Sequence, residues 1–208
     1  MNNLNDNEII QYIDLGCHIV KDKNKRFNEY LDILMEKKNW ILPFQYHEKL
    51  NITFSNLSFP KREEFKFTKS DLFDYFKFLN NKEIMNTPQF WAGNIFFKKC
   101  KVSQSFLLEW IDIMKNNFHL IDDSHSNIKN HVKFIENRHD QSVYSLLCKK
   151  YKLSSISAYE CDWAIKDNQR TWDNTLESPF QAKRDKKYNL LKRFLNRQKK
   201  NLKRFFKI

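Results

Sequence analysis

Short apolar runs alternate along this sequence with longer segments whose apolar residues recur every three or four positions. Four runs are apolar or β-branched and indicate strands: residues 9–13, 41–46, 89–97 and 155–159. Four segments have helical spacing: residues 26–34, 72–79, 103–118 and 140–151. Because strands and helices alternate, we expect an α/β domain in which helices cover a sheet.

Two local signals refine this pattern. Pro43 interrupts the second strand, so we expect an edge strand or an extended segment there. Residues 68–71 read Thr-Lys-Ser-Asp, which matches a capping box and predicts the start of a helix.

The apolar periodicity fades after residue 162. We therefore expect a domain over residues 1–162, a linker over residues 163–182 and a separate tail over residues 183–208.

The net charge is concentrated in the tail. The chain carries +12 in total, and residues 183–208 hold twelve Lys or Arg residues and one acid, which leaves +1 for the other 182 residues. A nearly neutral body lacks the broad basic surface of a nucleic-acid-binding domain. We therefore expect no specific nucleic-acid partner, and salt-dependent binding of nucleic acid by the tail alone stays an alternative.

The tail has the pattern of a basic amphipathic helix. Its apolar residues recur at helical spacing between lysines and arginines: Leu190, Leu191, Phe194, Leu195, Leu202, Phe205 and Phe206. Such helices lie on anionic membrane surfaces, although a helix docked on its own domain has the same pattern. No apolar run approaches the roughly 20 residues that cross a bilayer, and the amino terminus lacks a signal-peptide pattern. We expect a cytoplasmic protein, peripheral on the inner face of the cytoplasmic membrane.

Composition excludes several other classes. Aromatic residues make up 15% of the chain, which argues against disorder across most of its length. The four cysteines are widely spaced and show neither a Cys-x-x-Cys pair nor zinc-finger spacing. We expect reduced and mostly buried thiols, without a disulfide framework.

The chain has only two glycines, and each adjoins a distinctive polar segment. Residues 12–18 read Tyr-Ile-Asp-Leu-Gly-Cys-His, and residues 89–93 read Gln-Phe-Trp-Ala-Gly. A third segment, residues 138–142, reads Arg-His-Asp-Gln-Ser at the start of a predicted helix. Glycine permits a close backbone approach or a positive φ, so the two glycines mark either functional loops or ordinary turns and bulges.

Taken in this order, the three segments resemble a family of bacterial glycosyltransferases of capsule and lipopolysaccharide synthesis. The family carries a Tyr-x-Asp-x-Gly-Cys segment and a later Arg-His-Asp-Gln-Ser segment, and the resemblance spans roughly residues 8–160. It implies a GT-A-like, Rossmann-like fold with a mostly parallel sheet flanked by helices. It also implies transfer of a hexose from a nucleotide-sugar donor to a surface glycan or a lipid-linked acceptor.

Such folds usually place further strand-helix units before the acid-bearing strand, and here only 13 residues precede Asp14. The resemblance therefore implies missing amino-terminal strands and an incomplete donor site. A catalytically inactive remnant that acts as a binding or scaffold module is the alternative.

The resemblance assigns the charged residues of the site. Asp14 would face the donor and would hold a divalent cation, Mg²⁺ or Mn²⁺, although Gly16 stands where an Asp-x-Asp pair would have its second acid. Asp140 and His139 would act in catalysis, and Arg138 would lie near phosphate at a helix amino terminus. Asp140 is equally well explained as a residue that stabilises the helix end.

The remaining site residues would bind the substrate. We expect Tyr12, Gly16 and Gln141 in this role, and we expect the Gln-Phe-Trp-Ala-Gly segment to line the sugar site. Within that segment, Gln89 and Gly93 would border the sugar, and Trp91 would stack on a pyranose ring unless it is a core aromatic residue.

Overall fold

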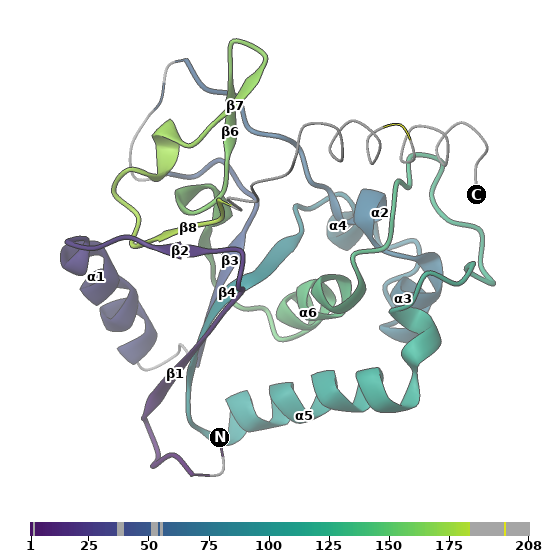
Figure 1. Cartoon of the computed structure of the whole chain (residues 1–208). Coiled ribbons are helices and arrows are strands. Elements are labelled where there is room, and N and C mark those ends of the chain that lie inside the picture. Colours follow the sequence, from purple (N-terminus) through teal and green to yellow (C-terminus); the bar gives the residue numbers. More distant parts are fainter. Residues whose placement is uncertain (2, 37–39, 51–53, 55, 184–197, 199–208) are drawn as a thin grey trace.

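Figure 1 shows the computed structural model of the chain, in which residues 1, 3–36, 40–50, 54, 56–183 and 198 are described. The helix expected in the basic tail lies almost entirely outside these residues. The strands are β1 (Ile9–Ile13), β2 (His18–Ile19), β3 (Ile41–Gln45), β4 (Phe90–Lys98), β5 (Ile156–Ser157), β6 (Ala164–Lys166), β7 (Gln169–Thr171) and β8 (Phe180–Gln181).

The α-helices are α1 (Asn24–Met35), α2 (Glu64–Phe67), α3 (Ser70–Tyr75), α4 (Lys82–Met85), α5 (Lys101–Asn116) and α6 (His139–Lys150). Short 3-10 turns follow at η1 (Phe118–Leu120), η2 (Ala158–Glu160) and η3 (Asp173–Thr175). Among the described residues, none of the helices combines the length and the apolar character needed to cross a bilayer.

The main sheet has the strand order β1-β4-β3-β5. β4 pairs antiparallel with both β1 and β3, and the pair of β3 with β5 is parallel. The fold is thus mixed α/β, and the expectation of a mostly parallel sheet is wrong. Hydrophobic periodicity indicates where strands lie but carries no information about their direction.

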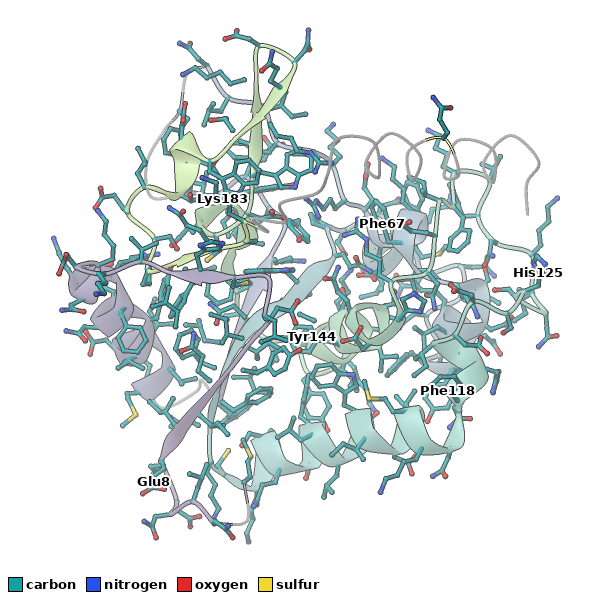
Figure 2. The ribbon with its side chains drawn as sticks, in the orientation of Figure 1. Glu8, Phe67, Phe118, His125, Tyr144 and Lys183 are labelled. Carbon is teal, nitrogen blue, oxygen red and sulfur yellow. The ribbon has the colours of Figure 1, made fainter. Side chains whose placement is uncertain are left out.

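Helices cover both faces of this sheet, as Figure 1 shows, with α1 on one face and α5 and α6 on the other. Each face has its own cluster of buried side chains. On the α6 side Tyr144 is fully buried and lies near the middle of the molecule in Figure 2. Phe106 of α5 packs edge-on against it, with ring centroids 5.9 Å apart. All nine residues of β4 are buried, because this strand lies between neighbours and beneath both helical layers.

β3 is an internal strand rather than the expected edge strand. Its pairing with β4 shifts register between Leu42 and Phe44, so Pro43 lies at a β-bulge. Proline has no N–H to donate to a sheet, and a bulge is one of the few places in a sheet where that absence costs little. The bulge in turn spans the segment of β4 that contains Gly93.

The Thr-Lys-Ser-Asp segment does begin a helix, α3, but without the expected capping box. The Thr68 hydroxyl donates instead to Glu64 Oε1, at 2.7 Å. The Asp71 carboxylate accepts the backbone N–H groups of Asn127 and Ile128, each at 2.8 Å. Tertiary contacts therefore take the polar groups that the local pattern assigns to the helix end.

The segment expected to be a linker contains ordered structure instead. β6 and β7 form a hairpin around Asp167 and Asn168, whose φ angles are 50° and 59°. Two residues with positive φ are the signature of a tight hairpin turn, usually made with glycine. β8 then pairs with β2, and Phe180 is buried. Residues 163–182 are therefore part of the folded domain, and their strands are too short for periodicity to reveal.

Candidate functional site

The candidate site begins where β1 ends against β4. The backbone N–H of Asp14 donates to the carbonyl of Gly93 at 2.9 Å, and the N–H of Cys17 donates to the carbonyl of Asp14 at 2.9 Å. The Tyr12 hydroxyl donates to Asp14 Oδ1 at 2.8 Å. The backbone of β4 and the hydroxyl of Tyr12 therefore fix the position of the Asp14 carboxylate.

The amino-terminal turn of α6 brings Asp140 to the same place. Partial desolvation, followed by the negative charge of Asp14, raises the pKa of Asp140. Desolvation, the hydrogen bond to Asp14 and the charges of Asp14 and Asp140 raise the pKa of Tyr12 to about 12. Two segments that lie far apart in the sequence thus form one acidic cluster, made of Tyr12, Asp14 and Asp140.

This cluster predicts an electrostatic coupling that can be measured. In an Asp14→Asn variant the neighbouring negative charge is lost, so the pKa of Asp140 should fall toward its ordinary value. Titration of the Asp140 side-chain carbon by NMR would measure the shift, and Asp112→Asn, on the exposed face of α5, is the matched control. An unchanged pKa of Asp140 in Asp14→Asn would show that the two acids do not share a site.

Gln141 ties α6 to β4 beside this cluster. Its Nε2 donates to Gln89 Oε1 at 2.8 Å, and its Oε1 accepts the backbone N–H of Ala92 at 3.5 Å. Both groups of the Gln141 side-chain amide are thus used within the protein. In this structure Gln141 supports the site from the α6 side, whereas the sequence suggested direct contact with substrate.

Gln89 and Trp91 do not line an open sugar site, which corrects the expectation from the sequence. Gln89 is fully buried, and Trp91 is 7% exposed. The Trp91 ring packs edge-on against Phe44, with centroids 6.1 Å apart. The cause is the position of β4 at the centre of the sheet, where both faces of the strand are covered.

The Trp91 ring leaves no space for a side chain at residue 93, so this position needs glycine. A Cβ atom at Gly93 would lie 2.4 Å from Trp91 Cε2, closer than non-bonded carbon atoms can approach. Neither glycine has a positive φ, so the backbone of Gly16 makes no comparable demand. The structure therefore explains Gly93 by packing and gives Gly16 no steric role.

The two glycines should therefore respond differently to substitution by alanine. Gly93→Ala must displace the Trp91 indole, and we expect the free energy of unfolding to fall by about 1–3 kcal/mol, as for other overpacked cores. Gly16→Ala should change it by less than about 0.5 kcal/mol. Urea denaturation of both variants tests this pair, and equal stability of the two would contradict the packing around Gly93.

His139 lies at the first position of α6 with a φ of 50°, an uncommon conformation for a residue other than glycine. Its Nδ1 is 2.6 Å from the carbonyl oxygen of Ile121, and its Nε2 is 3.8 Å from Asp123 Oδ1. The carbonyl contact assigns the Nδ1 proton to that bond. The structure thus places the imidazole on residues 121–123, while the pKa of the next residue, Asp140, responds to the charge of Asp14.

Arg138 lies just before the helix, with its guanidinium carbon 3.9 Å from the centre of the Phe67 ring. Glu136 is an acidic neighbour of Arg138, with its Oε1 3.7 Å from Arg138 Nε. Burial, followed by the positive charge of Arg62, lowers the pKa of Arg138. Arg62 is itself paired with Asp162 at 2.9 Å. These two guanidiniums form a basic region next to the start of α6.

The sequence motifs did not point to the buried acid beneath this site. Glu64 of α2 is fully buried and pairs with Lys149 of α6. Its contacts in α6 also include Ser145, and Ser142 lies one turn earlier on the same face. The one available signal was a polar stripe at positions 142, 145 and 149 in a helix that is otherwise apolar on its buried side.

Comparison with family models, with curated proteins and with solved structures gave no match. The residues that the structure describes contain no group of three or more His, Cys, Asp or Glu side chains arranged to hold a metal ion. What is known of the site therefore rests on its own geometry.

Proposed function

We propose that this chain transfers a hexose from a nucleotide-sugar donor to a bacterial surface glycan or a lipid-linked acceptor, on a GT-A-like fold. The observation that supports this most is the meeting of the Tyr-x-Asp and Arg-His-Asp-Gln segments, whose acids Asp14 and Asp140 interact electrostatically. Both segments carry the resemblance to glycosyltransferases, and a site that uses both needs them together.

The groups at the cluster suit glycosyl transfer. The reaction needs a proton acceptor for the acceptor hydroxyl and positive charge at the leaving diphosphate. The raised pKa of Asp140 makes it a stronger base than an ordinary carboxylate. The amino terminus of α6 and the guanidinium of Arg138 supply the positive potential that the leaving diphosphate needs. We assign proton transfer to Asp140 and donor orientation to Asp14.

A divalent cation fits Asp14. Carboxylate oxygens are the ligands that Mg²⁺ and Mn²⁺ prefer, and Mg²⁺ is commonly held by one or two carboxylates together with substrate phosphates. Asp14 would hold the ion, whose charge would neutralise the departing nucleoside diphosphate.

The basic tail fits an acceptor at a membrane. Residues 183–208 combine the excess of Lys and Arg with an apolar stripe, and such helices bind anionic lipid surfaces. We propose that the protein works at the inner face of the cytoplasmic membrane, where a lipid-linked acceptor would be within reach.

Release of the donor nucleotide tests the proposal. The chain is incubated with UDP-, GDP- and CMP-sugars and with bacterial membrane lipids as the source of the acceptor, with and without Mn²⁺, and the free nucleotide is quantified by chromatography. We expect release from at least one donor, its loss in Asp14→Asn and its retention in the control Asp112→Asn. If the folded protein binds a donor without releasing nucleotide, it is a binding module, and equal release by wild type and Asp14→Asn would contradict the site.

A further inference from the structure

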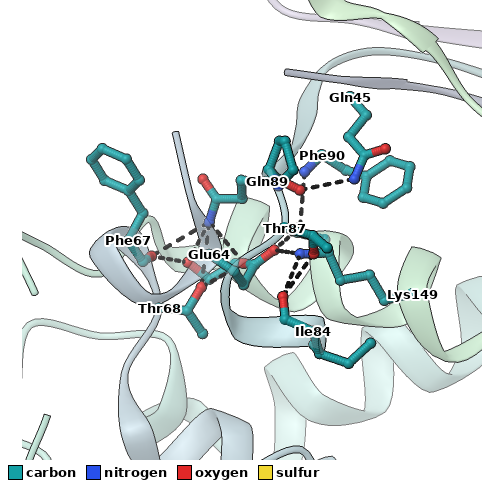
Figure 3. Close-up of polar contacts among 12 residues, drawn as sticks. Gln45, Glu64, Phe67, Thr68, Ile84, Thr87, Gln89, Phe90 and Lys149 are labelled. Carbon is teal, nitrogen blue, oxygen red and sulfur yellow. Dashed lines mark hydrogen bonds and ion pairs between the residues drawn. The ribbon is translucent and has the colours of Figure 1, made fainter. Parts of the chain in front are cut away.

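Glu64 is the centre of a buried polar network beneath the candidate site (Figure 3). Its Oε1 accepts the Thr68 hydroxyl at 2.7 Å and Gln89 Nε2 at 3.2 Å. Its Oε2 accepts the Ser145 hydroxyl and the ammonium group of Lys149. A fully buried carboxylate is stable only when its oxygens are satisfied in this way.

The network gives the amide groups next to the site a fixed direction. An ionised carboxylate can only accept, so Gln89 must turn its NH₂ group toward Glu64 and its carbonyl oxygen away. That oxygen accepts Gln141 Nε2 at 2.8 Å. Gln141 must then present its own oxygen to the N–H of Ala92. The charge on Glu64, together with the Phe67 carbonyl at 3.4 Å from Gln89 Nε2, therefore sets the orientation of the Gln141 side chain, two hydrogen bonds away.

The same acid also anchors α6 along its length. Ser145 and Lys149, which both contact Glu64, lie one and two turns beyond Gln141. One turn earlier, the Ser142 hydroxyl donates to the carbonyl of Phe67 at 2.6 Å and accepts the N–H of Arg138 at 3.0 Å. The helix is thus held at three positions on one face, residues 142, 145 and 149.

We propose that Glu64 is a positioning residue for the site: through Gln89 and Gln141 it fixes the first turn of α6, which carries Asp140. The effect of Glu64 on catalysis rests on the proposed function. Its effect on the position of α6 does not depend on that function. Glu64 does not reach the acidic cluster itself. Its effect passes through the two glutamines and through the anchored helix.

The cost of this arrangement supports a role beyond packing. A buried ion pair is weak evidence for stability, since apolar residues of similar volume often stabilise a fold equally well. Burial lowers the pKa of Lys149, and the charge of Glu64 opposes that shift. The chain thus keeps a costly charged pair at the helix that carries Asp140.

Glu64→Gln tests the proposal, because the variant keeps the shape of the side chain and removes the charge that fixes the direction of the amides. The control is Glu160→Gln on the opposite side of the sheet. Glu160 accepts Arg26 Nη2 at 2.7 Å and the Tyr30 hydroxyl at 2.8 Å, so it is also a mostly buried, paired acid. The readouts are the side-chain amide resonances of Gln89 and Gln141 and the backbone N–H resonances of the first turn of α6.

We expect Glu64→Gln to shift both amide resonances and the backbone resonances of the first turn of α6, and Glu160→Gln to leave them in place. With an active donor, kcat should fall by about tenfold or more at similar KM, because a small displacement of a catalytic group is costly. If Glu64→Gln leaves the Gln141 resonance and the first turn of α6 unchanged, the positioning role is overturned. If these shift in a protein that turns over no donor, the positioning stands and the proposed function fails.

Discussion

Lys149→Met should lower the free energy of unfolding by about 3–5 kcal/mol, because it leaves the charge of Glu64 buried without its partner. Glu64 is fully buried, and the side chain of Lys149 is 5% exposed. Thr68, Ser145 and Gln89 would still donate to the carboxylate, but neutral donors compensate a buried charge less well than an ammonium group. Chemical denaturation with urea, monitored by tryptophan fluorescence, measures the loss.

A double variant separates the missing partner from the missing contacts. Glu64→Gln together with Lys149→Met removes both charges, so it should recover a large part of the stability lost in Lys149→Met alone. Lys150→Met is the matched single control, because the side chain of Lys150 is 49% exposed and its pair with Glu109 lies at the surface. Equal losses in Lys149→Met and Lys150→Met would contradict the buried ion pair.

Asp140→Asn should lower donor turnover by at least about 100-fold while leaving the fold intact. Removing a general base typically costs two to four orders of magnitude in rate.

The same substitution should not lower the free energy of unfolding. A carboxyl group with a raised pKa holds its proton more tightly in the folded state, so the free energy of unfolding falls as pH rises from the usual Asp value, about 3.9, through the raised value.

Asparagine removes this dependence on pH, so the variant should be at least as stable as the wild type at neutral pH. Turnover and thermal unfolding measured on the same samples test both parts. The matched control is Asp173→Asn, because Asp173 is exposed and pairs with Lys166 at the surface. A variant that loses stability and activity together would show that Asp140 acts as a structural helix-end residue and not in proton transfer.

Periodicity predicted the main elements because each of them is long enough for its apolar residues to show a period. β1, β4, α1, α5 and α6 all lie where the sequence indicates. The β6–β7 hairpin was missed because each strand has three residues. Its turn uses Asp167 and Asn168 in a chain with two glycines, so the usual glycine signal is absent.

The candidate site was predictable in part. The motifs pointed to Asp14 and Asp140, and the charge of Asp14 raises the pKa of Asp140. The motifs also pointed to Gln89 and Trp91 as sugar contacts, and both are buried. A short polar or aromatic segment reads the same whether it borders a ligand or supports the residues that do. Glu64 was missed for a related reason, since a lone acid in sequence is usually at the surface.

Calorimetric titration of nucleotide sugars into wild type, Asp14→Asn and Asp140→Asn decides whether the two motifs form one donor site. UDP-, GDP- and CMP-sugars are titrated with and without Mn²⁺, and circular dichroism verifies that each protein is folded. We expect saturable heat from at least one donor with the wild type, and affinity weakened by tenfold or more in Asp14→Asn. Equal affinity in all three proteins, or no heat from any donor with the folded wild type, would contradict a nucleotide-sugar site at Asp14 and Asp140.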